Sequence, residues 1–225
     1  MKAALSQYEV DIRLSPDTLQ ALMATGYSLL VLKAVQTHDG GAAPLVWFRT
    51  DRLTLTTSVT WQEQYQAYIS PSQIVSNGMI HPGATVDISM GQTAQVSADG
   101  VMTATDGGAT SAISIFNQDY QTWTCGVSQV VAGQANPVCA VQVISNMVDI
   151  ITPVEQVLLM FSNMSMNTGT VMVKASTFGL LVDLRDATQR TVQFDINNGW
   201  TWGGGAWGHS VQPNANLLPL LIQNS

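Results

Sequence analysis

One stretch of the sequence decides the fold: residues 52–70, RLTLTTSVTWQEQYQAYIS. Apolar side chains occupy most of its odd-numbered positions, beginning with Leu53 and Leu55, while Thr, Ser and Gln occupy most of its even-numbered positions. Neighbouring side chains of a β-strand point to opposite faces of a sheet, so this alternation predicts a long strand with one buried face. Pro71, which cannot donate a backbone hydrogen bond to a neighbouring strand, ends the stretch.

Most of the remaining chain has the pattern of shorter strands separated by turn residues. We predict these strands at 8–14, 27–36, 45–49, 84–90, 93–98, 101–105, 112–116, 122–127, 139–144, 157–161, 170–175, 178–184 and 191–196. Between two of them, Asp99 and Gly100 are a strong signal for a two-residue hairpin turn.

One helix is predicted, over residues 16–24. Ser15 can cap it and Pro16 suits the first helical position, while Gly26 can close it. A second apolar segment, residues 152–161, leaves two possibilities open, a helix that begins near Pro153 or a buried strand.

The composition also favours strands. Charged residues make up 10% of the chain, and only three residues are Glu and three are Lys. β-Branched and short polar residues are plentiful instead, and these favour extended chain and turns. Hydrophobic residues make up 46%, enough for a sizeable core. We therefore predict an all-β fold, a two-layer antiparallel β-sandwich with one short N-terminal helix, as a single domain over residues 1–225.

The charge and the apolar pattern restrict the possible partners. The net charge is −7 with only eight basic residues, so we predict no nucleic-acid partner and no adsorption driven by anionic lipids. No apolar stretch approaches the length of a transmembrane helix. The N-terminus lacks the apolar core of a signal peptide, so we expect cytoplasmic synthesis, and release by a route without a leader is left open.

No catalytic motif is present in the sequence. His38, His81 and His209 each lie near Gly or Pro in expected loops, without metal-ligand spacing. Most aspartates lie in turn-like sequence, and Asp87, Asp183 and Asp195 fall within strand patterns. We therefore predict a protein that is not an enzyme and that uses neither a cofactor nor a metal.

The two cysteines, Cys125 and Cys139, flank a turn-rich stretch. If the flanking segments pair as a hairpin centred near Ala132, the two sulfur atoms lie opposite each other and a disulfide is possible. The alternative is a pair of buried free thiols that pack as small hydrophobic groups.

The most unusual local feature is residues 198–209, in which Trp200, Trp202 and Trp207 lie among glycines. Exposed indole rings suit the face of a sugar, a membrane interface or a protein partner. We therefore predict a ligand site for a glycan or a membrane headgroup, in which Asn198 and His209 supply polar contacts. In the alternative, Trp200 and Trp202 share one strand face and pack into the core.

Two other functions stay open. Residues 52–70, with a partner strand from 84–105, could form a membrane-inserting hairpin of a β-pore, although Glu63 on the apolar side argues against its middle facing lipid. Its membrane-active candidates are Leu53, Leu55, Val59, Trp61 and Tyr65. Self-association into a homo-oligomer is the third possibility, because a surface with little charge offers little repulsion. In composition alone, the chain resembles microbial β-rich lectins and cytolysins.

Overall fold

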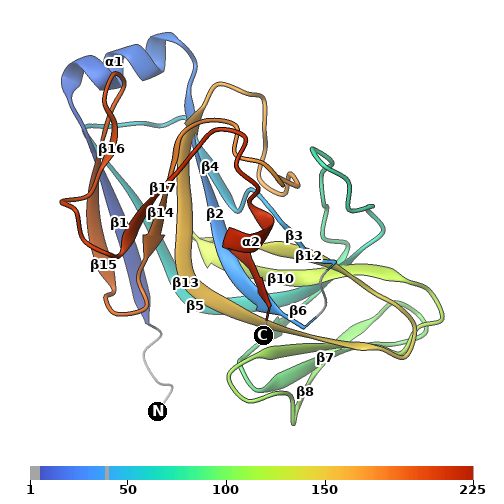
Figure 1. Cartoon of the computed structure of the whole chain (residues 1–225). Coiled ribbons are helices and arrows are strands. Elements are labelled where there is room, and N and C mark those ends of the chain that lie inside the picture. Colours follow the sequence, from blue (N-terminus) through green and yellow to red (C-terminus); the bar gives the residue numbers. More distant parts are fainter. Residues whose placement is uncertain (1–5, 39–40, 225) are drawn as a thin grey trace.

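Strands dominate the computed structural model, which describes residues 6–38 and 41–224 and is drawn in Figure 1. The strands form two curled sheets. The first sheet has the order β16 (Gly199–Thr201), β15 (Gln189–Asp195), β1 (Gln7–Leu14), β5 (Thr56–Ser70), β10 (Trp123–Val131), β12 (Cys139–Val143) and β3 (Ala43–Pro44), and β6 (Ala84–Ile88) pairs with β5 while β11 (Gln134–Pro137) pairs with β10.

The second sheet has the order β17 (Gly208–Val211), β14 (Gly179–Asp183), β13 (Val148–Ser162), β9 (Ile113–Asn117), β7 (Gln92–Val96) and β8 (Met102–Asp106). In addition, β2 (Ser28–Thr37) pairs with β13, with β4 (Phe48–Thr50) and with β18 (Ile222–Asn224). The two helices of the described residues are α1 (Pro16–Ala24) and α2 (Leu218–Leu221).

Two strands, β5 and β13, are much longer than the others, with 15 residues each. At about 3.3 Å per residue, each could span roughly 45 Å if it were straight. Each is instead bent, and its pairing shifts register once, between Gln129 and Val131 of β10 and between Pro153 and Val157 of β13. Such bulges increase local twist and let a sheet curl. In Figure 1, β13 curves from its C-terminal end, beside β14, towards β7 and β8.

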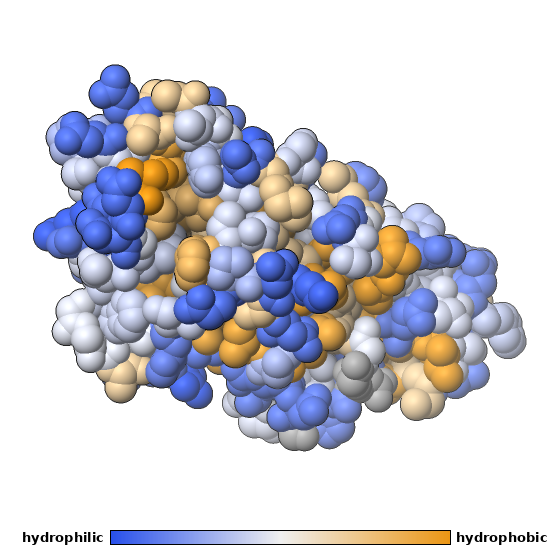
Figure 2. Space-filling model, turned by 45° about the horizontal axis from the view of Figure 1, so that its top comes forward, coloured by the Kyte–Doolittle hydropathy of each residue, from blue (hydrophilic) through white to orange (hydrophobic). Residues whose placement is uncertain are grey.

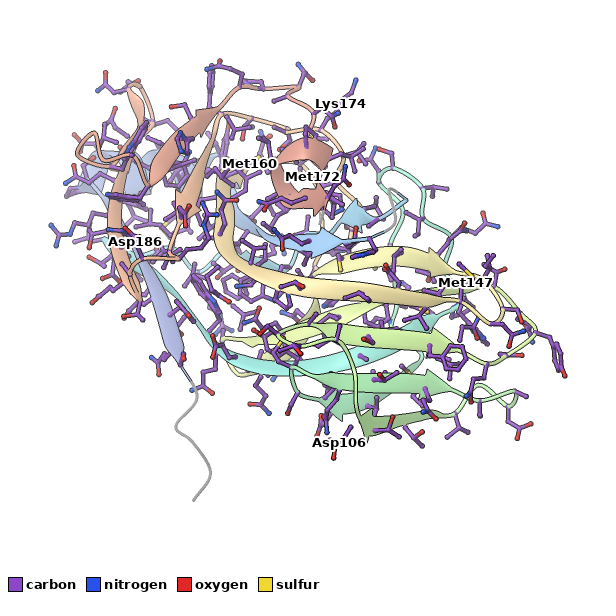
Figure 3. The ribbon with its side chains drawn as sticks, turned by 60° about the horizontal axis from the view of Figure 1, so that its bottom comes forward. Asp106, Met147, Met160, Met172, Lys174 and Asp186 are labelled. Atoms are coloured by element: carbon purple, nitrogen blue, oxygen red, sulfur yellow. The ribbon has the colours of Figure 1, made fainter. Side chains whose placement is uncertain are left out.

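Hydrophobic side chains are buried on both faces of the second sheet. Its inner face shares one cluster with the first sheet, in which Val31 and Leu159 contact the same core as Val59 and Val127. Its outer face packs against irregular segments and α2, and Met160 and Met172 of this second cluster lie beneath α2 in Figure 3. Burial on both faces explains why β2 reads as a continuous apolar run without alternation.

Several sequence predictions are confirmed. The fold is mainly β, and α1 has the predicted bounds, with the Ser15 hydroxyl accepting a hydrogen bond from the Thr18 backbone N–H. Buried and exposed residues alternate along the first half of β5. The ambiguous segment at 152–161 is a strand, part of β13.

The prediction of purely antiparallel sheets is wrong. Three pairs are parallel: β1 with β15, β7 with β9, and β2 with β18. Alternation reports which face is buried but not the direction of the partner, and a pair far apart in sequence has no tight turn to force it antiparallel. The finer assignment as a two-layer sandwich stays a prediction.

Two local predictions also need correction. The β7–β8 turn has three residues, Ala98 to Gly100, because the Ser97 backbone N–H bonds to the Val101 carbonyl and Gly100 takes a left-handed φ of 70°. The predicted strand at 170–175 makes only isolated bridges, to Leu45, Met79 and Asn216. The neighbours of that segment are loops, so its apolar pattern reflects burial without a continuous ladder.

A buried ion pair of the second sheet is hydrogen-bonded to a tryptophan of the first sheet. Lys33 of β2 is fully buried, and its Nζ donates to Glu155 Oε2 of β13 at 2.6 Å. The same carboxylate oxygen accepts from Trp61 Nε1 of β5, in the other sheet, at 2.8 Å. Lys33 Nζ also lies 5.0 Å from the centroid of the Trp61 ring. Burial lowers the pKa of Lys33, and Glu155 opposes that shift.

This centre predicts an asymmetric response to mutation. Glu155→Gln should lower the free energy of unfolding by about 3–5 kcal/mol, because it leaves the Lys33 ammonium buried without its counter-ion. The double variant Lys33→Met/Glu155→Gln should be less destabilised than Glu155→Gln alone, since it removes the buried charge as well. Urea denaturation of the three proteins measures both effects. Equal stability of Glu155→Gln and the native chain would contradict a structural role for the pair.

Candidate functional site

An aromatic pocket lies at the C-terminal end of β13. It is a cavity of about 650 Å³ in which aromatic side chains from distant parts of the chain meet. These are Tyr27, Phe161, Phe178, Phe194 and Trp200. The whole chain contains six Trp, five Tyr and five Phe, so almost a third of its aromatic residues line this one cavity.

The wall of the aromatic pocket is a packed group of three rings. The rings of Phe161 and Trp200 are stacked with centroids 5.4 Å apart, and Phe194 lies 4.6 Å from Phe161 and 4.9 Å from Trp200. Phe161 comes from β13, whereas the other two come from the β15–β16 hairpin. Offset and tilted arrangements at these distances are favourable for aromatic rings, so the wall is held by its own packing.

The rim of the aromatic pocket is polar and uncharged. Its polar lining side chains are Ser176, Thr177, Asn197, Asn198, Ser210 and Gln212. None of the lining residues is Asp, Glu, Lys or Arg. Phe178, which is 57% exposed, presents the most accessible ring. A cavity with aromatic walls and neutral hydrogen-bonding groups suits a ligand without net charge.

Asp195 holds the loop that forms one side of the rim. Its Oδ1 accepts hydrogen bonds from the backbone N–H groups of Asn197 and Asn198 at 3.0 and 2.9 Å, and its Oδ2 accepts from Thr18 Oγ1 of α1. The backbone hydrogen bonds from Asn197 and Asn198 hold the pKa of Asp195 below its usual range. This carboxylate is therefore ionised at neutral pH and ties the rim to α1.

The structure separates the residues predicted for the Gly/Trp loop. Asn198 and Trp200 line the aromatic pocket, but Trp200 is only 8% exposed and belongs to the hydrophobic core, as the alternative interpretation holds. Trp202 and Trp207 are partly buried outside the pocket, and His209 is exposed on β17. The five predicted residues thus do not form one surface.

Glycines allow the two remaining indoles to fold back onto the chain. A Cβ added to Gly208 would lie 2.5 Å from the Trp202 ring, and one added to Gly205 would lie 2.3 Å from Trp207 Nε1. Trp202 Nε1 donates to the Gly205 carbonyl at 2.9 Å, and Arg190 lies 4.7 Å from the centroid of the Trp207 ring. Gly205 and Gly208 are therefore explained by close packing of indole rings, whereas Gly203 and Gly204 take a left-handed φ of 75° and 77°.

The membrane-active candidates lie mostly inside the protein. Leu53, Val59, Trp61 and Tyr65 are buried in the inner core, and Leu55 is 52% exposed next to α1. β5 is hydrogen-bonded to β1 and β6 on one side and to β10 on the other. The expected partner segment 84–105 is divided, since β6 joins β5 whereas β7 and β8 belong to the second sheet.

The two cysteines are buried free thiols in this structure. The residue opposite Cys125 is Val141, and Cys139 lies opposite Pro44 of β3 instead. The two turn residues of this hairpin are Ala132 and Gly133, so its centre lies between them and not at Ala132, and an extra residue at Val138, between β11 and β12, shifts the register again. The predicted alignment of the two sulfur atoms across one hairpin therefore does not occur.

No pattern in the sequence marks Tyr27, Phe161, Phe178 or Phe194 as pocket residues, because they come from four separate segments. Within residues 6–38 and 41–224, no three His, Cys, Asp or Glu side chains are grouped to hold a metal ion. No helix in the same part of the chain is long and apolar enough to span a membrane. In Figure 2, hydrophobic side chains are visible between hydrophilic ones near the α1 end, at the upper left.

No protein-family model, no curated protein and no solved structure matches this chain.

The free thiols predict low chemical reactivity. Burial raises the pKa of Cys125 and of Cys139 from 9.0 to about 12, so the native protein should not react with a thiol reagent at pH 8. Both should react in urea. Their contribution to stability is complete below pH 9 and is lost as the pH rises towards 12, because the unfolded chain ionises first. An intact-mass measurement of the unreduced protein that shows a disulfide would contradict this state.

Proposed function

We propose that this protein recognises a neutral, ring-shaped ligand, such as a sugar residue of a glycan, in the aromatic pocket, without catalysing a reaction. The observation that carries the proposal is the combination of five aromatic side chains with a rim of amides and hydroxyls that bears no charge. A sugar offers the matching surfaces, since its C–H face packs on an aromatic ring while its hydroxyls bond to polar side chains.

The residues of the aromatic pocket would have different roles in binding. Phe178 presents its ring to solvent, and the buried rings of Phe161 and Trp200 support the wall behind the ligand. Asn198 is fixed by its own hydrogen bond from Nδ2 to Asp195 Oδ1 at 2.9 Å, so its side-chain carbonyl faces a defined direction before the ligand arrives. Such preorganisation lowers the entropy lost on binding.

The other two functions receive less support from these contacts. Pore formation would require β5 to leave three hydrogen-bonded neighbours and would expose Val59, Trp61 and Tyr65 from the core. Self-association is not needed to build the aromatic pocket, because all of its lining residues come from one chain. Ligand recognition uses the protein as it is folded.

The Phe178→Ala variant tests the proposal once a screen of neutral glycans has supplied a ligand. It should weaken binding by about fivefold to tenfold, corresponding to roughly 1 kcal/mol of lost aromatic contact. Its unfolding midpoint should be nearly unchanged, because the ring is mostly exposed. Isothermal titration calorimetry measures the affinity.

The matched control is Tyr120→Ala, which removes another exposed aromatic side chain, far from the pocket, and should bind as the native chain does. Two results would contradict the proposal: a screen of neutral glycans that yields no ligand, or equal affinities of Phe178→Ala and the native protein. Trp200→Ala is unsuitable, because loss of a core ring should cost about 3–5 kcal/mol of stability.

A further inference from the structure

A second cavity, of about 420 Å³, lies at the other end of the molecule, where β5 ends. Ile69 and Ala84 of the first sheet form one side of it. The other side comes from the β7–β8 turn, with Asp99, and from the β9–β10 connection, with Asp119 and Trp123. We call this the acidic cavity, because two carboxylates and one indole are its polar and aromatic features.

Hydrogen bonds fix the side chains of the acidic cavity. Asp119 is only 3% exposed, and its Oδ2 accepts from Trp123 Nε1 at 2.9 Å. The Asp119 backbone N–H in turn donates to Asn117 Oδ1 at 3.0 Å. Gly100 lies against the Trp123 ring, since a Cβ added to it would be 3.7 Å from the indole. The indole and one carboxylate therefore keep a constant relative position.

Within residues 6–38 and 41–224, no Lys or Arg side chain pairs with these carboxylates. Between Arg52 and Lys174 the sequence contains no Lys or Arg, and this segment includes β5 to β13. Neither Asp99 nor Asp119 takes part in an ion pair described for this structure. In Figure 3, Lys174 lies on the opposite side of the molecule from Asp106 of β8. In the part of the chain that the structure describes, the acidic cavity thus combines negative charge and an aromatic ring without a Lys or Arg counter-ion.

Exposed apolar side chains surround the acidic cavity. Tyr120, between two lining residues, is 87% exposed, and Val101 next to the β7–β8 turn is 57% exposed. The β12–β13 turn adds Ile144 and Met147, and it is tied to the same region because the Asn146 backbone N–H donates to the Asn117 carbonyl at 2.7 Å. Figure 3 shows Met147 near the tip of this turn.

We propose that the acidic cavity binds the trimethylammonium group of a zwitterionic phosphatidylcholine-type headgroup at a lipid surface. A methylated ammonium is attracted to the face of an indole and to carboxylates at the same time. The exposed tyrosine, valine, isoleucine and methionine would then contact the interfacial layer of the lipid. The lack of Lys and Arg in this part of the chain disfavours anionic lipids. This inference does not depend on the aromatic pocket, which lies at the other end of β13.

Choline chloride is the probe for the cation site in the full-length protein, measured by isothermal titration calorimetry. Native protein should bind choline, whereas 3,3-dimethylbutanol, its uncharged isostere, should bind at least about fivefold more weakly. The Asp99→Asn variant should also lose about fivefold in affinity. Asp87→Asn, which removes an exposed carboxylate of β6 outside the acidic cavity, should not change it. Equal binding of the two probes, or equal affinities of Asp99→Asn and Asp87→Asn, would overturn the site.

Vesicles distinguish the lipid source from a free cation. Phosphatidylcholine vesicles should sediment the protein, choline should compete, and phosphatidylglycerol vesicles should sediment it less. Choline binding without vesicle binding would overturn the lipid source. Trp123→Phe keeps an aromatic ring but loses the hydrogen bond from Trp123 Nε1 to Asp119, so it should weaken choline binding. Tyr120→Ala, in contrast, should weaken vesicle binding and leave choline binding unchanged. All of these variants should still bind the neutral glycan. That result would show that the acidic cavity and the aromatic pocket are separate sites.

Discussion

The Glu155 carboxylate is the contact on which the arrangement of the two sheets depends. One oxygen accepts from Lys33 of its own sheet and from Trp61 of the other sheet. Around it, Tyr8 stacks on Trp61 with centroids 5.7 Å apart and Trp47 meets Trp61 edge-on at 5.6 Å. A buried ion pair gives little net stability, but it is costly to misplace: another register of β2 against β13 would leave Lys33 without its partner, and another alignment of the two sheets would leave the buried Trp61 Nε1 without its acceptor. Burial and the nearby Glu155 and Glu63 also raise the pKa of Tyr8 to about 12.

The long strands β5 and β13 end at two cavities with different lining side chains. β5 runs from the neighbourhood of α1 to the acidic cavity, and β13 runs from the β9 side to the aromatic pocket. Arg185 and Arg190 pair with Asp183 and Asp186 at the β14–β15 turn, whereas the segment from β5 to β13 has no Lys or Arg. The chain thus carries a neutral aromatic cavity and an acidic one at opposite ends of the long strands.

The sequence could predict what depends on local pattern. Alternation in 52–70 reports a half-buried strand, and Ser15–Pro16 reports the start of α1, because both signals are local. Lys33 within an apolar run and Glu63 on the apolar face were visible in the sequence, but their partners were not. Lys33 donates to Glu155, 122 residues away, and Glu63 accepts from Tyr8, 55 residues away. Strand direction, the bulge at Val138 and the meeting of Phe161 with Trp200 are set by tertiary packing that leaves no periodic signal.

The Gly/Trp segment shows why composition could mark an unusual region but could not say which of its rings are exposed. Glycines between tryptophans can indicate a flexible loop in which the indole rings are exposed to solvent. They can also indicate a backbone without Cβ atoms, against which the indole rings pack closely. The contacts at Gly205 and Gly208 favour the second meaning. Trp200 is both a core residue and a pocket residue, so binding in the aromatic pocket and folding of that end are linked, and a ligand there should stabilise the native state. The acidic cavity has no such link through Asp99, because that side chain lies at an exposed turn outside the core clusters. Under the proposed function, the α1 end of the molecule would therefore couple recognition to stability, whereas the turn residues at the opposite end can vary at little cost to the fold.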